Sequence, residues 1–295
     1  DLSIVENCYN TGKVSGNRYV GGVVGDNRGT VENCYNTGTV SDGGISGGVV
    51  GCNQGGSVQN CYNTGAVSGS EFVGGVVGYN LIRSTVENCY NIGEVSGNSS
   101  VGGVVGYNDS NGNVTGCYFL QTDTVNVNLP DIGKNDGSGS ATAKDNTAFH
   151  SGEVAWQLQN GQTAAGEGGV VPLVWGQSDL NTPDSWPTLV ALDKNENAKP
   201  VYKVVFISDN TEIEAQYANS MTVGSPTTNP TKEGYTFAGW FTESSGGSQW
   251  NFSTAVTENM TLYAKWTPVA EPDPTPTPTP DPTPSGPSTG DSTGW

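Results

Sequence analysis

One phrase, which recurs every 26 to 28 residues, dominates the first 119 residues of this chain. Its first full copy reads VENCYNTGKVSGNRYVGGVVGDN, and its Cys-Tyr pair occurs five times, at Cys8-Tyr9, Cys34-Tyr35, Cys61-Tyr62, Cys89-Tyr90 and Cys117-Tyr118. A single copy has too few apolar side chains to offset the conformational entropy that is lost when it is ordered. The copies must therefore stack on one another to fold.

The spacing within the phrase separates a fixed part from a variable part. After each cysteine, 19 residues lead to the asparagine that closes the glycine-valine run, at Asn27, Asn53, Asn80 and Asn108. From that asparagine to the next cysteine the distance is 7, 8, 9 and 9 residues. All insertions fall in residues 28–33, 54–60, 81–88 and 109–116, which is typical of a solenoid whose loops are confined to one edge.

Short valine-rich runs bounded by Asn, Gly and Ser indicate strands rather than helices. We expect three strands per coil, near Val5, Val14 and Val23, in a mainly β protein with a right-handed parallel β-solenoid over residues 1–119. Either the valine column that contains Val23 or the one that contains Val24 could face inward, and the sequence leaves this choice open. Because the chain opens at Asp1 within a repeat, we expect it to be a fragment of a longer protein.

Five of the six cysteines share one position of the repeat, at Cys8, Cys34, Cys61, Cys89 and Cys117. Strands stacked in register place equivalent side chains about 4.8 Å apart and pointing the same way. A disulfide instead needs Cβ atoms about 3.8 Å apart that turn toward each other. We predict a structural ladder of buried, reduced thiols. Cys52 shares its position with Asp26, Tyr79 and Tyr107, so we expect it to face outward, with any pairing being intermolecular.

Two columns of asparagine accompany the cysteines: Asn7, Asn33, Asn60 and Asn88, and then Asn10, Asn36, Asn63 and Asn91. Stacked amides can hydrogen-bond to their counterparts above and below. We expect both columns to form such ladders. A structural role is favoured over a chemical one, because a catalytic group is used once and is not copied in every coil.

Composition restricts the partners and the chemistry. The 29 acidic and 11 basic side chains give a formal net charge of −18, which disfavours nucleic acid and anionic membranes. The single histidine, His150, offers no converging metal ligands, so we expect no metal and no cofactor. The solenoid's basic residues Lys13, Arg18, Arg28 and Arg83 are scattered over different positions, so no polysaccharide-cleaving cluster is indicated. We expect no enzymatic activity.

The segments VGGVVGDN (Val20–Asn27) and ENCYNTG (Glu6–Gly12) resemble the GLUG repeat of bacterial surface and secreted proteins. The resemblance covers residues 5–119 and implies a β-solenoid segment. Some members of that family are IgA metallopeptidases of the streptococcal type, which carry an H-E-x-x-H zinc motif in a separate domain. This sequence contains no such motif.

Residues 120–200 interrupt the repeat and are expected to cap the open end of the solenoid. Their one helix candidate lies in residues 143–161, with Ser151 as its N-cap and Gly161 at its end. Trp175 and Trp186 are expected to be buried against the last coil, although they could instead line a ligand groove. His150 is interpreted as a polar residue at a helix end.

Residues 201–268 have the composition of a small, aromatic-rich β domain. The strings GYTFAGW (Gly234–Trp240) and LYAKW (Leu262–Trp266) resemble the internalin-type B repeat, also called the listerial–Bacteroides repeat, which implies a small β-grasp-like module of surface proteins. A domain of this size has little core. The expected core consists of Phe206, Tyr235, Phe237, Trp240, Trp250, Phe252, Leu262, Tyr263 and Trp266, with exposed ligand-binding rings as the alternative.

Residues 269–295 form a spacer rich in Pro and Thr, whose alternate prolines favour extended polyproline II over packing. Its last part, GPSTGD, is similar to the P-x-T-G core of sortase sorting signals, with Gly286 where that family has leucine. The resemblance implies a covalent cell-wall anchor at Pro287, Thr289 and Gly290, with Thr289 as the acyl link. A spacer of this composition also produces such a string by chance.

Repeats, cap, small β module and spacer, in this order, indicate a non-catalytic display or adhesin module on the bacterial cell surface, either wall-attached or secreted. A host or neighbouring-cell surface protein or glycan would be its partner. One alternative is a carbohydrate-binding surface protein, with Tyr79 and Tyr107 as the ligand-facing aromatics. A second alternative is the non-catalytic repeat region of a secreted peptidase or polysaccharide-active enzyme.

Overall fold

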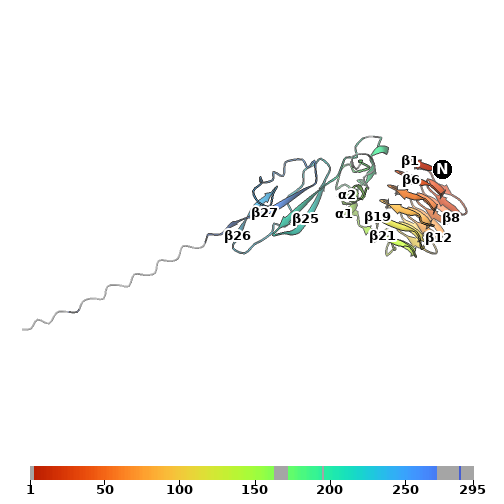
Figure 1. The fold of residues 1–295 in the computed structure, drawn as a ribbon, viewed down its shortest axis with the longest axis horizontal. Coiled ribbons are helices and arrows are strands. Elements are labelled where there is room, and N and C mark those ends of the chain that lie inside the picture. The colour runs from red at the N-terminus through yellow and green to blue at the C-terminus, as the bar shows by residue number, and fades with distance from the viewer. Residues whose placement is uncertain (1–2, 163–171, 195, 271–285, 287–295) are drawn as a thin grey trace, which may run out of the picture.

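The computed structural model describes residues 3–162, 172–194, 196–270 and 286. Three parts follow one another along the chain (Figure 1): a stack of β coils, a segment with two helices, and a small separate sheet. The sheet of the third part lies beside the helices, and the helices lie beside the coils.

Three parallel sheets run along the stack of coils. The largest sheet has ten strands: β1 (Ile4–Glu6), β6 (Thr30–Glu32), β10 (Ser57–Gln59), β14 (Thr85–Glu87), β19 (Asn113–Leu120), β15 (Tyr90–Asn91), β11 (Tyr62–Asn63), β7 (Tyr35–Asn36), β2 (Tyr9–Asn10) and β21 (Ser138–Lys144). The second has six: β3 (Val14–Ser15), β4 (Tyr19–Gly21), β8 (Val40–Gly47), β12 (Val67–Gly74), β16 (Val95–Ser96) and β17 (Val101–Gly102). The third has five: β5 (Val24–Asn27), β9 (Val50–Gln54), β13 (Val77–Leu81), β18 (Val105–Asn108) and β20 (Ile132–Asn135).

The strands pair in the register that the repeat predicts. Val5 lies opposite Val31, Val31 opposite Val58, and Tyr35 opposite Tyr62. The prediction of a parallel β-solenoid is confirmed. Stacking continues beyond residue 119, however, because β20 pairs with β18 and β21 pairs with β19 to add a last coil. The expected boundary at 119/120 therefore does not mark the end of the coils.

The glycine pair of each repeat lies where the second sheet turns into the third. A Cβ atom on Gly48 would lie 2.1 Å from the carbonyl oxygen of Gly75 and 2.4 Å from Cγ of Asn63. A Cβ atom on Gly47 would lie 1.9 Å from the carbonyl oxygen of Val50. Backbones therefore approach so closely at this turn, both within a coil and between coils, that only glycine fits.

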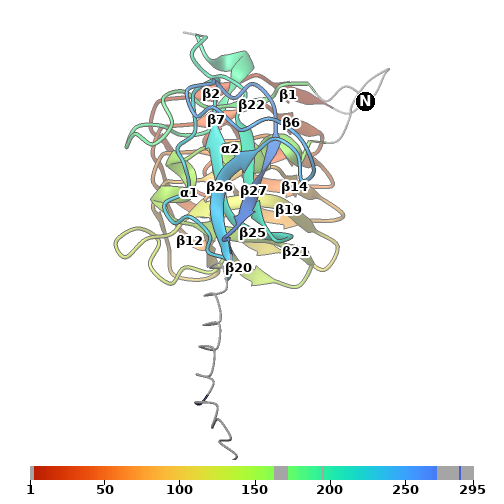
Figure 2. The ribbon, with the colours of Figure 1, turned by 90° about the vertical axis from the view of Figure 1, so that its left-hand side faces the viewer.

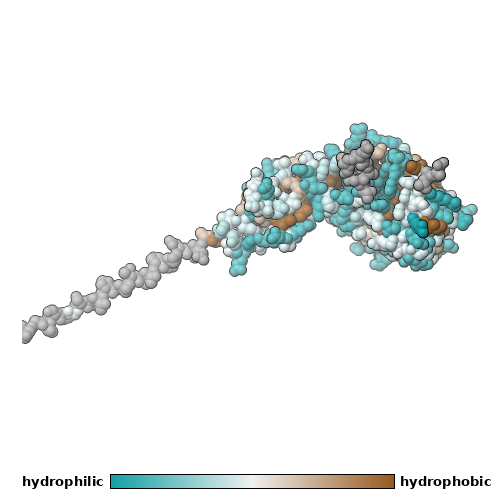
Figure 3. All heavy atoms as spheres, viewed as in Figure 1, coloured by the Kyte–Doolittle hydropathy of each residue, from teal (hydrophilic) through white to brown (hydrophobic). Residues whose placement is uncertain are grey.

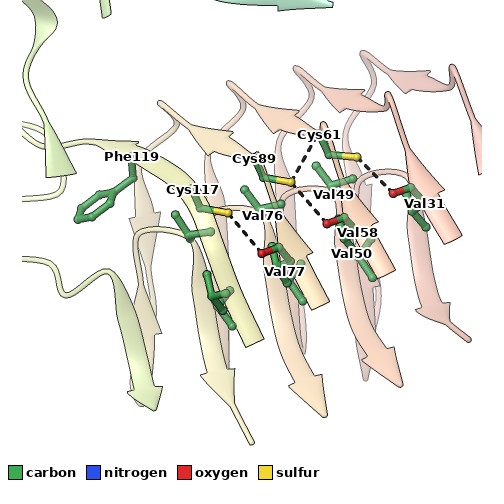
Figure 4. Packing of buried hydrophobic residues seen from close by; sticks show 14 of the residues in the cluster. Val31, Val49, Val50, Val58, Cys61, Val76, Val77, Cys89, Cys117 and Phe119 are labelled. Atoms are coloured by element: carbon green, nitrogen blue, oxygen red, sulfur yellow. Dashed lines mark hydrogen bonds between the residues drawn. The ribbon is translucent and has the colours of Figure 1, made fainter. Parts of the chain in front are cut away.

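Both valine columns at this turn face the interior. Val49, Val76 and Val104 and their successors Val50, Val77 and Val105 are all 0% exposed and share one core with the cysteines (Figure 4). The expectation that one column would face outward is wrong. Val49 lies in the turn before β9, outside regular strand structure, so simple alternation does not apply to it.

Two asparagine ladders run through the stack, but only one of them is a predicted one. Nδ2 of Asn63 donates to Oδ1 of Asn91 at 2.8 Å, and the same contact links Asn36 to Asn63 at 2.7 Å. The second ladder links Asn27, Asn53, Asn80, Asn108 and Asn135. No such bonds link the described residues of the column that contains Asn7. Its members instead adopt φ between 50° and 55° at a turn, which asparagine tolerates better than most residues.

The segment after the last coil contains two helices, α1 (Asn146–His150) and α2 (Glu153–Asn160), instead of the one expected. Asp145 caps α1 by accepting a hydrogen bond from the amide of Ala148, and Ser151 is the C-cap of α1. Gly152, with φ 95°, precedes α2, so Ser151 does not begin it. His150 ends α1 and Gly161 is the C-cap of α2, as expected.

The helices lie along the side of the solenoid and not across its end. They pack with the two-stranded sheet of β22 (Trp175–Gly176) and β23 (Thr188–Leu189), followed by a 3-10 turn at Val190–Leu192. Their apolar partners on the solenoid are the tyrosines of the repeat. β20, β21 and Phe119 close the stack itself, and Phe119 takes the register position of Asn91. The expected end cap is therefore mostly a lateral cover.

The third part is a sheet of four strands in the order β25-β24-β27-β26: β24 (Tyr202–Ser208), β25 (Thr211–Ala218), β26 (Tyr235–Phe241) and β27 (Met260–Pro268). Its core includes Phe206, Trp240 and Leu262. Tyr235 is 42% exposed and is not a core residue, contrary to expectation. Tyr263 and Trp266 are half-buried outside this core cluster. The described residues 201–268 contain no helix, and the β-grasp-like comparison stays a prediction.

Candidate functional surfaces of the solenoid

The variable position of the repeat forms one column on the third sheet. Asp26 pairs with Cys52, Cys52 with Tyr79, Tyr79 with Tyr107, and Tyr107 with Lys134. Because each coil contributes a different residue here, the column breaks the uniformity of the solenoid surface. It is the first candidate for a specific function.

Three aromatic rings gather at this column. The rings of Tyr79 and Tyr107 stack with centroids 5.0 Å apart and an interplanar angle of 7°. Phe72, from the neighbouring second sheet, lies 5.1 Å from the ring of Tyr79 and 5.0 Å from that of Tyr107, both at steep angles. All three side chains are half-buried. The structure thus brings the two predicted aromatics together and adds Phe72.

Both faces of the Tyr107 ring and one face of the Tyr79 ring are already occupied. Tyr79 and Tyr107 face each other, and Nζ of Lys134 lies 4.3 Å from the centroid of the Tyr107 ring. The Tyr107 hydroxyl donates to Asp136 at 2.8 Å, and Lys134 pairs with the same carboxylate at 2.9 Å. A sugar stacks on an open ring face, as a cation does. The cluster therefore presents ring edges and a salt-linked hydroxyl more than a stacking platform.

Hydrogen bonding within this network shifts the pKa values of its charged groups. The hydrogen bond to Asp136 raises the pKa of Lys134, and the bond from Lys134 lowers the pKa of the Asp136 carboxyl. Both side chains are at the surface, where water screens such a pair. The arrangement holds charges in a fixed place and is not that of a proton-transfer pair.

Cys52 is buried, with 2% exposure, although it belongs to the outward column. The expectation that it faces solvent and pairs between molecules is therefore wrong. Burial raises the pKa of its thiol to about 11, and the nearby Asp26 carboxylate contributes in the same direction. A thiol with such a pKa is a poor nucleophile near neutral pH.

The structural thiols lie inside the stack. Cys34, Cys61, Cys89 and Cys117 are buried and free, whereas Cys8 in the first coil is exposed. Each of these four buried thiols donates to carbonyl oxygens. Sγ of Cys89 donates to Glu87 at 3.1 Å and to Val58 at 3.8 Å, and Figure 4 shows the bond to Val58. Sγ of Cys89 also accepts from the amide of Cys61 at 3.4 Å. Burial raises the pKa values of Cys61, Cys89 and Cys117, so their neutral form is favoured.

The tyrosines that follow the cysteines form a stack that the sequence reasoning missed. Tyr9, Tyr35, Tyr62 and Tyr90 lie 4.9 to 5.1 Å apart, ring centroid to ring centroid. Their regular recurrence was the signal that could have predicted this stack. The residues that cover this tyrosine stack come from a segment far away in the sequence.

The cover of the tyrosine stack comes from the segment with the two helices. Trp175 is 0% exposed and lies 6.1 Å from the ring of Tyr62 and 5.7 Å from that of Tyr90. Trp186 is half-buried, and the centroid of its ring lies 4.5 Å from that of the His150 ring. Burial lowers the pKa of His150. The tryptophans therefore belong to a packed interior along the third and fourth coils and not to an open groove.

The described residues contain no group of three or more His, Cys, Asp or Glu side chains that could hold a metal ion. The candidate anchor residues Pro287, Thr289 and Gly290 lie outside the described residues. No helix in the part of the chain that the structure describes is long and apolar enough to cross a membrane.

Two kinds of repeat known from other proteins account for most of this architecture. Four copies of the GLUG motif match residues 16–41, 42–68, 69–96 and 97–122. A Listeria-Bacteroides repeat domain matches residues 202–265, which include all of β24, β25 and β26 and part of β27. The chain is therefore a repeat protein with four GLUG motifs and one Listeria-Bacteroides repeat.

Similar curated proteins share only a part of the chain. Internalin H of Listeria monocytogenes is 42% identical over 68 residues, which are 22% of this chain and 12% of the internalin. Two proteins of Evansella cellulosilytica, named as a membrane protein and a Gly-rich membrane protein, are each 42% identical over 57 and 71 residues, or 19% and 22% of this chain. The chain spans 8 to 12% of the length of these three relatives.

Proposed function

We propose that the chain is a non-catalytic display module of an extracellular bacterial surface protein, with adhesion as its role. The observation that carries this proposal is the use of the repeated side chains. The Asn36 column, the Cys61 column and the Tyr62 column are all engaged between coils or under the lateral cover. What remains for function is the outer surface of the stacked coils. Internalin H and the membrane-protein relatives share a part of this sequence, which supports a surface location.

The partner of the adhesin would be a protein or glycan on a host or neighbouring cell. The test is binding of the purified chain, immobilised on beads, to host cells, to matrix proteins and to a glycan array. Saturable binding to any of them supports adhesion. If the beads bind none of these surfaces, the module is a stalk that only holds other domains away from the cell.

Carbohydrate binding is the alternative that the aromatic cluster suggests. Because both faces of the Tyr107 ring and one face of the Tyr79 ring are occupied, we expect a Tyr79→Ala, Tyr107→Ala variant to retain any glycan binding that the chain has. If this variant loses glycan binding while its far-UV circular dichroism is unchanged, the carbohydrate site lies at the column after all. A Tyr19→Ala variant is the matched control, because Tyr19 is an equally half-buried tyrosine of the first coil.

The chain could also be the repeat region of a larger secreted peptidase or polysaccharide-active enzyme. This second alternative remains because the relatives extend far beyond the matched part.

For the display module and for both alternatives, we propose covalent attachment to the cell wall through Thr289, with Pro287 and Gly290 completing the signal. Mass spectrometry of wall fragments tests this attachment: a peptide that ends at Thr289 and carries a wall-derived amine supports it, and release of the protein by detergent alone contradicts it.

A further inference from the structure

The strand β25 is an edge of the four-stranded sheet, and its pairing with β24 leaves part of its backbone unpaired. Asp209 and Asn210 join the two strands, and both have positive φ, as in a two-residue hairpin turn. In such a hairpin the flanking residues, here Ser208 and Thr211, form a hydrogen-bonded pair. Pairs then alternate between hydrogen-bonded and non-hydrogen-bonded. A one-residue bulge precedes Glu214. When the alternation is continued past this bulge, Ala215 and Tyr217 occupy non-hydrogen-bonded positions. Their N–H and C=O groups point away from β24.

A cleft lies next to this part of β25, between the strand and the helices. It has a volume of about 500 Å³ and lies between Ala215–Tyr217 and the first turns of α1 and α2. Residues 222–224 line it as well. Figure 1 shows the two helices beside the β25 side of the sheet. A cleft of this volume lies within the range of ligand sites, and a strand rises about 3.4 Å per residue. With a strand spacing of about 4.8 Å and a sheet spacing of about 10 Å, one extended residue fills about 160 Å³. The space thus suits about three residues of extended peptide.

The helical wall of the cleft is acidic and polar. It presents the carboxylates of Asp145 and Glu153 and the hydroxyls of Thr147 and Ser151, and no Lys, Arg or His is among the lining residues. Lys144 pairs with Glu153 from outside the lining. Burial, together with the carboxylates of Glu153 and Glu212, raises the pKa of Tyr217 to about 12. Lys144 offsets the charge of Glu153, and Asp145, which also caps α1, leaves the lining with a net negative charge that favours a positively charged occupant.

We propose that this cleft is a peptide-binding groove, in which an extended segment of a partner protein with Lys or Arg at alternate positions adds to β25 as a fifth strand. The unpaired backbone groups of Ala215 and Tyr217 supply the main-chain hydrogen bonds, and every second side chain of the segment faces Asp145 and Glu153. The inference does not depend on adhesion or on glycan binding.

The binding test uses the full chain and the synthetic peptide acetyl-Thr-Lys-Val-Lys-Thr-Lys-Thr-amide. We expect saturable binding and slower hydrogen exchange at the amides of Ala215 and Tyr217, measured by NMR. Two control peptides separate the contributions: one has Gln for every Lys, and the other keeps Lys but has Pro at alternate positions, so that it cannot form a strand. Both should bind at least roughly tenfold more weakly, a difference of about 1.4 kcal/mol. Equal binding of the Pro peptide, or protection confined to other amides, would overturn the proposal.

Variants of the wall and of the strand test the same groove from the protein side. Ala215→Pro removes only an outward N–H, a loss that an edge strand tolerates. This variant should bind the peptide at least about tenfold more weakly. The control Ala215→Val keeps the N–H and should bind as the natural chain does. Asp145→Asn retains the helix cap and should weaken binding about three- to tenfold, with a smaller salt dependence. Unchanged affinity in both Ala215→Pro and Asp145→Asn, with native circular dichroism, would refute the groove.

Discussion

Replacing Asn63 by alanine should destabilise the solenoid by about 3–5 kcal/mol. The Asn63 amide makes four hydrogen bonds: Nδ2 donates to Gly65 O at 2.7 Å and to Asn91 at 2.8 Å, and Oδ1 accepts from the Gly65 amide at 3.3 Å and from Asn36 at 2.7 Å. Asn63 is 0% exposed, so water cannot replace the lost amide. At about 1 kcal/mol for each bond, the loss is a large fraction of the stability of a typical domain.

The assay is equilibrium unfolding in urea, followed by far-UV circular dichroism and by tryptophan fluorescence. Coincidence of the two transitions justifies a two-state free energy. Asn10→Ala is the matched control. Asn10 is in the same column and also bonds to the glycine two residues on, but it bonds to one neighbouring coil only, and it is partly exposed, so water can replace its lost hydrogen bonds. We expect Asn10→Ala to cost about 1 kcal/mol. If the two variants lose equal stability, or if Asn63→Ala loses less than about 1 kcal/mol, the ladder does not hold the coils together.

Three further outcomes follow from the packing. Gly48→Ala should abolish the native circular dichroism spectrum, since the added Cβ would meet backbone at 2.1 Å, whereas Gly44→Ala, with its nearest atom at 3.5 Å, should melt as the natural chain does. Ellman's reagent should modify one thiol of the native chain rapidly, that of Cys8, and the others only after unfolding; rapid reaction of Cys52 would contradict its burial. Burial raises the pKa of Cys61 in the folded state, while an unfolded thiol ionises near its ordinary value of 9.0. Stability should therefore be complete below pH 9 and fall as pH rises above it, and a urea midpoint that stays constant to about pH 10.5 would refute this linkage.

The solenoid could be predicted because its period is explicit in the sequence. The constant distance from Cys34 to Asn53 and from Cys61 to Asn80 fixes which residues lie above one another, and parallel pairing follows from that. The aromatic cluster was partly predictable for the same reason. Tyr79 and Tyr107 share a register position, whereas Phe72 joins them from another sheet.

The sequence-based predictions are wrong where the geometry of a turn or a segment far away in the sequence determines the position of a side chain. Asn33 and Asn36 recur equally often, but only backbone geometry separates the turn residue with φ 53° from the ladder residue. Val49 turns inward because it lies in the turn between two sheets. Trp175 covers the tyrosine stack from more than 80 residues beyond Tyr90. No pattern within the repeat contains that information, and the same holds for the cleft beside Ala215.

Amide hydrogen exchange tests the stacking of the coils most directly. The amides of Val49 and Val76 donate to the carbonyls of Val76 and Val104 in the next coil, both at 2.9 Å, and thus report on contacts between coils alone. We predict that these amides exchange only through global unfolding, with the free energy that urea denaturation gives. Exchange at the rates of an unstructured peptide, or with free energies that differ from coil to coil, would contradict a stack stabilised by its repeated side chains.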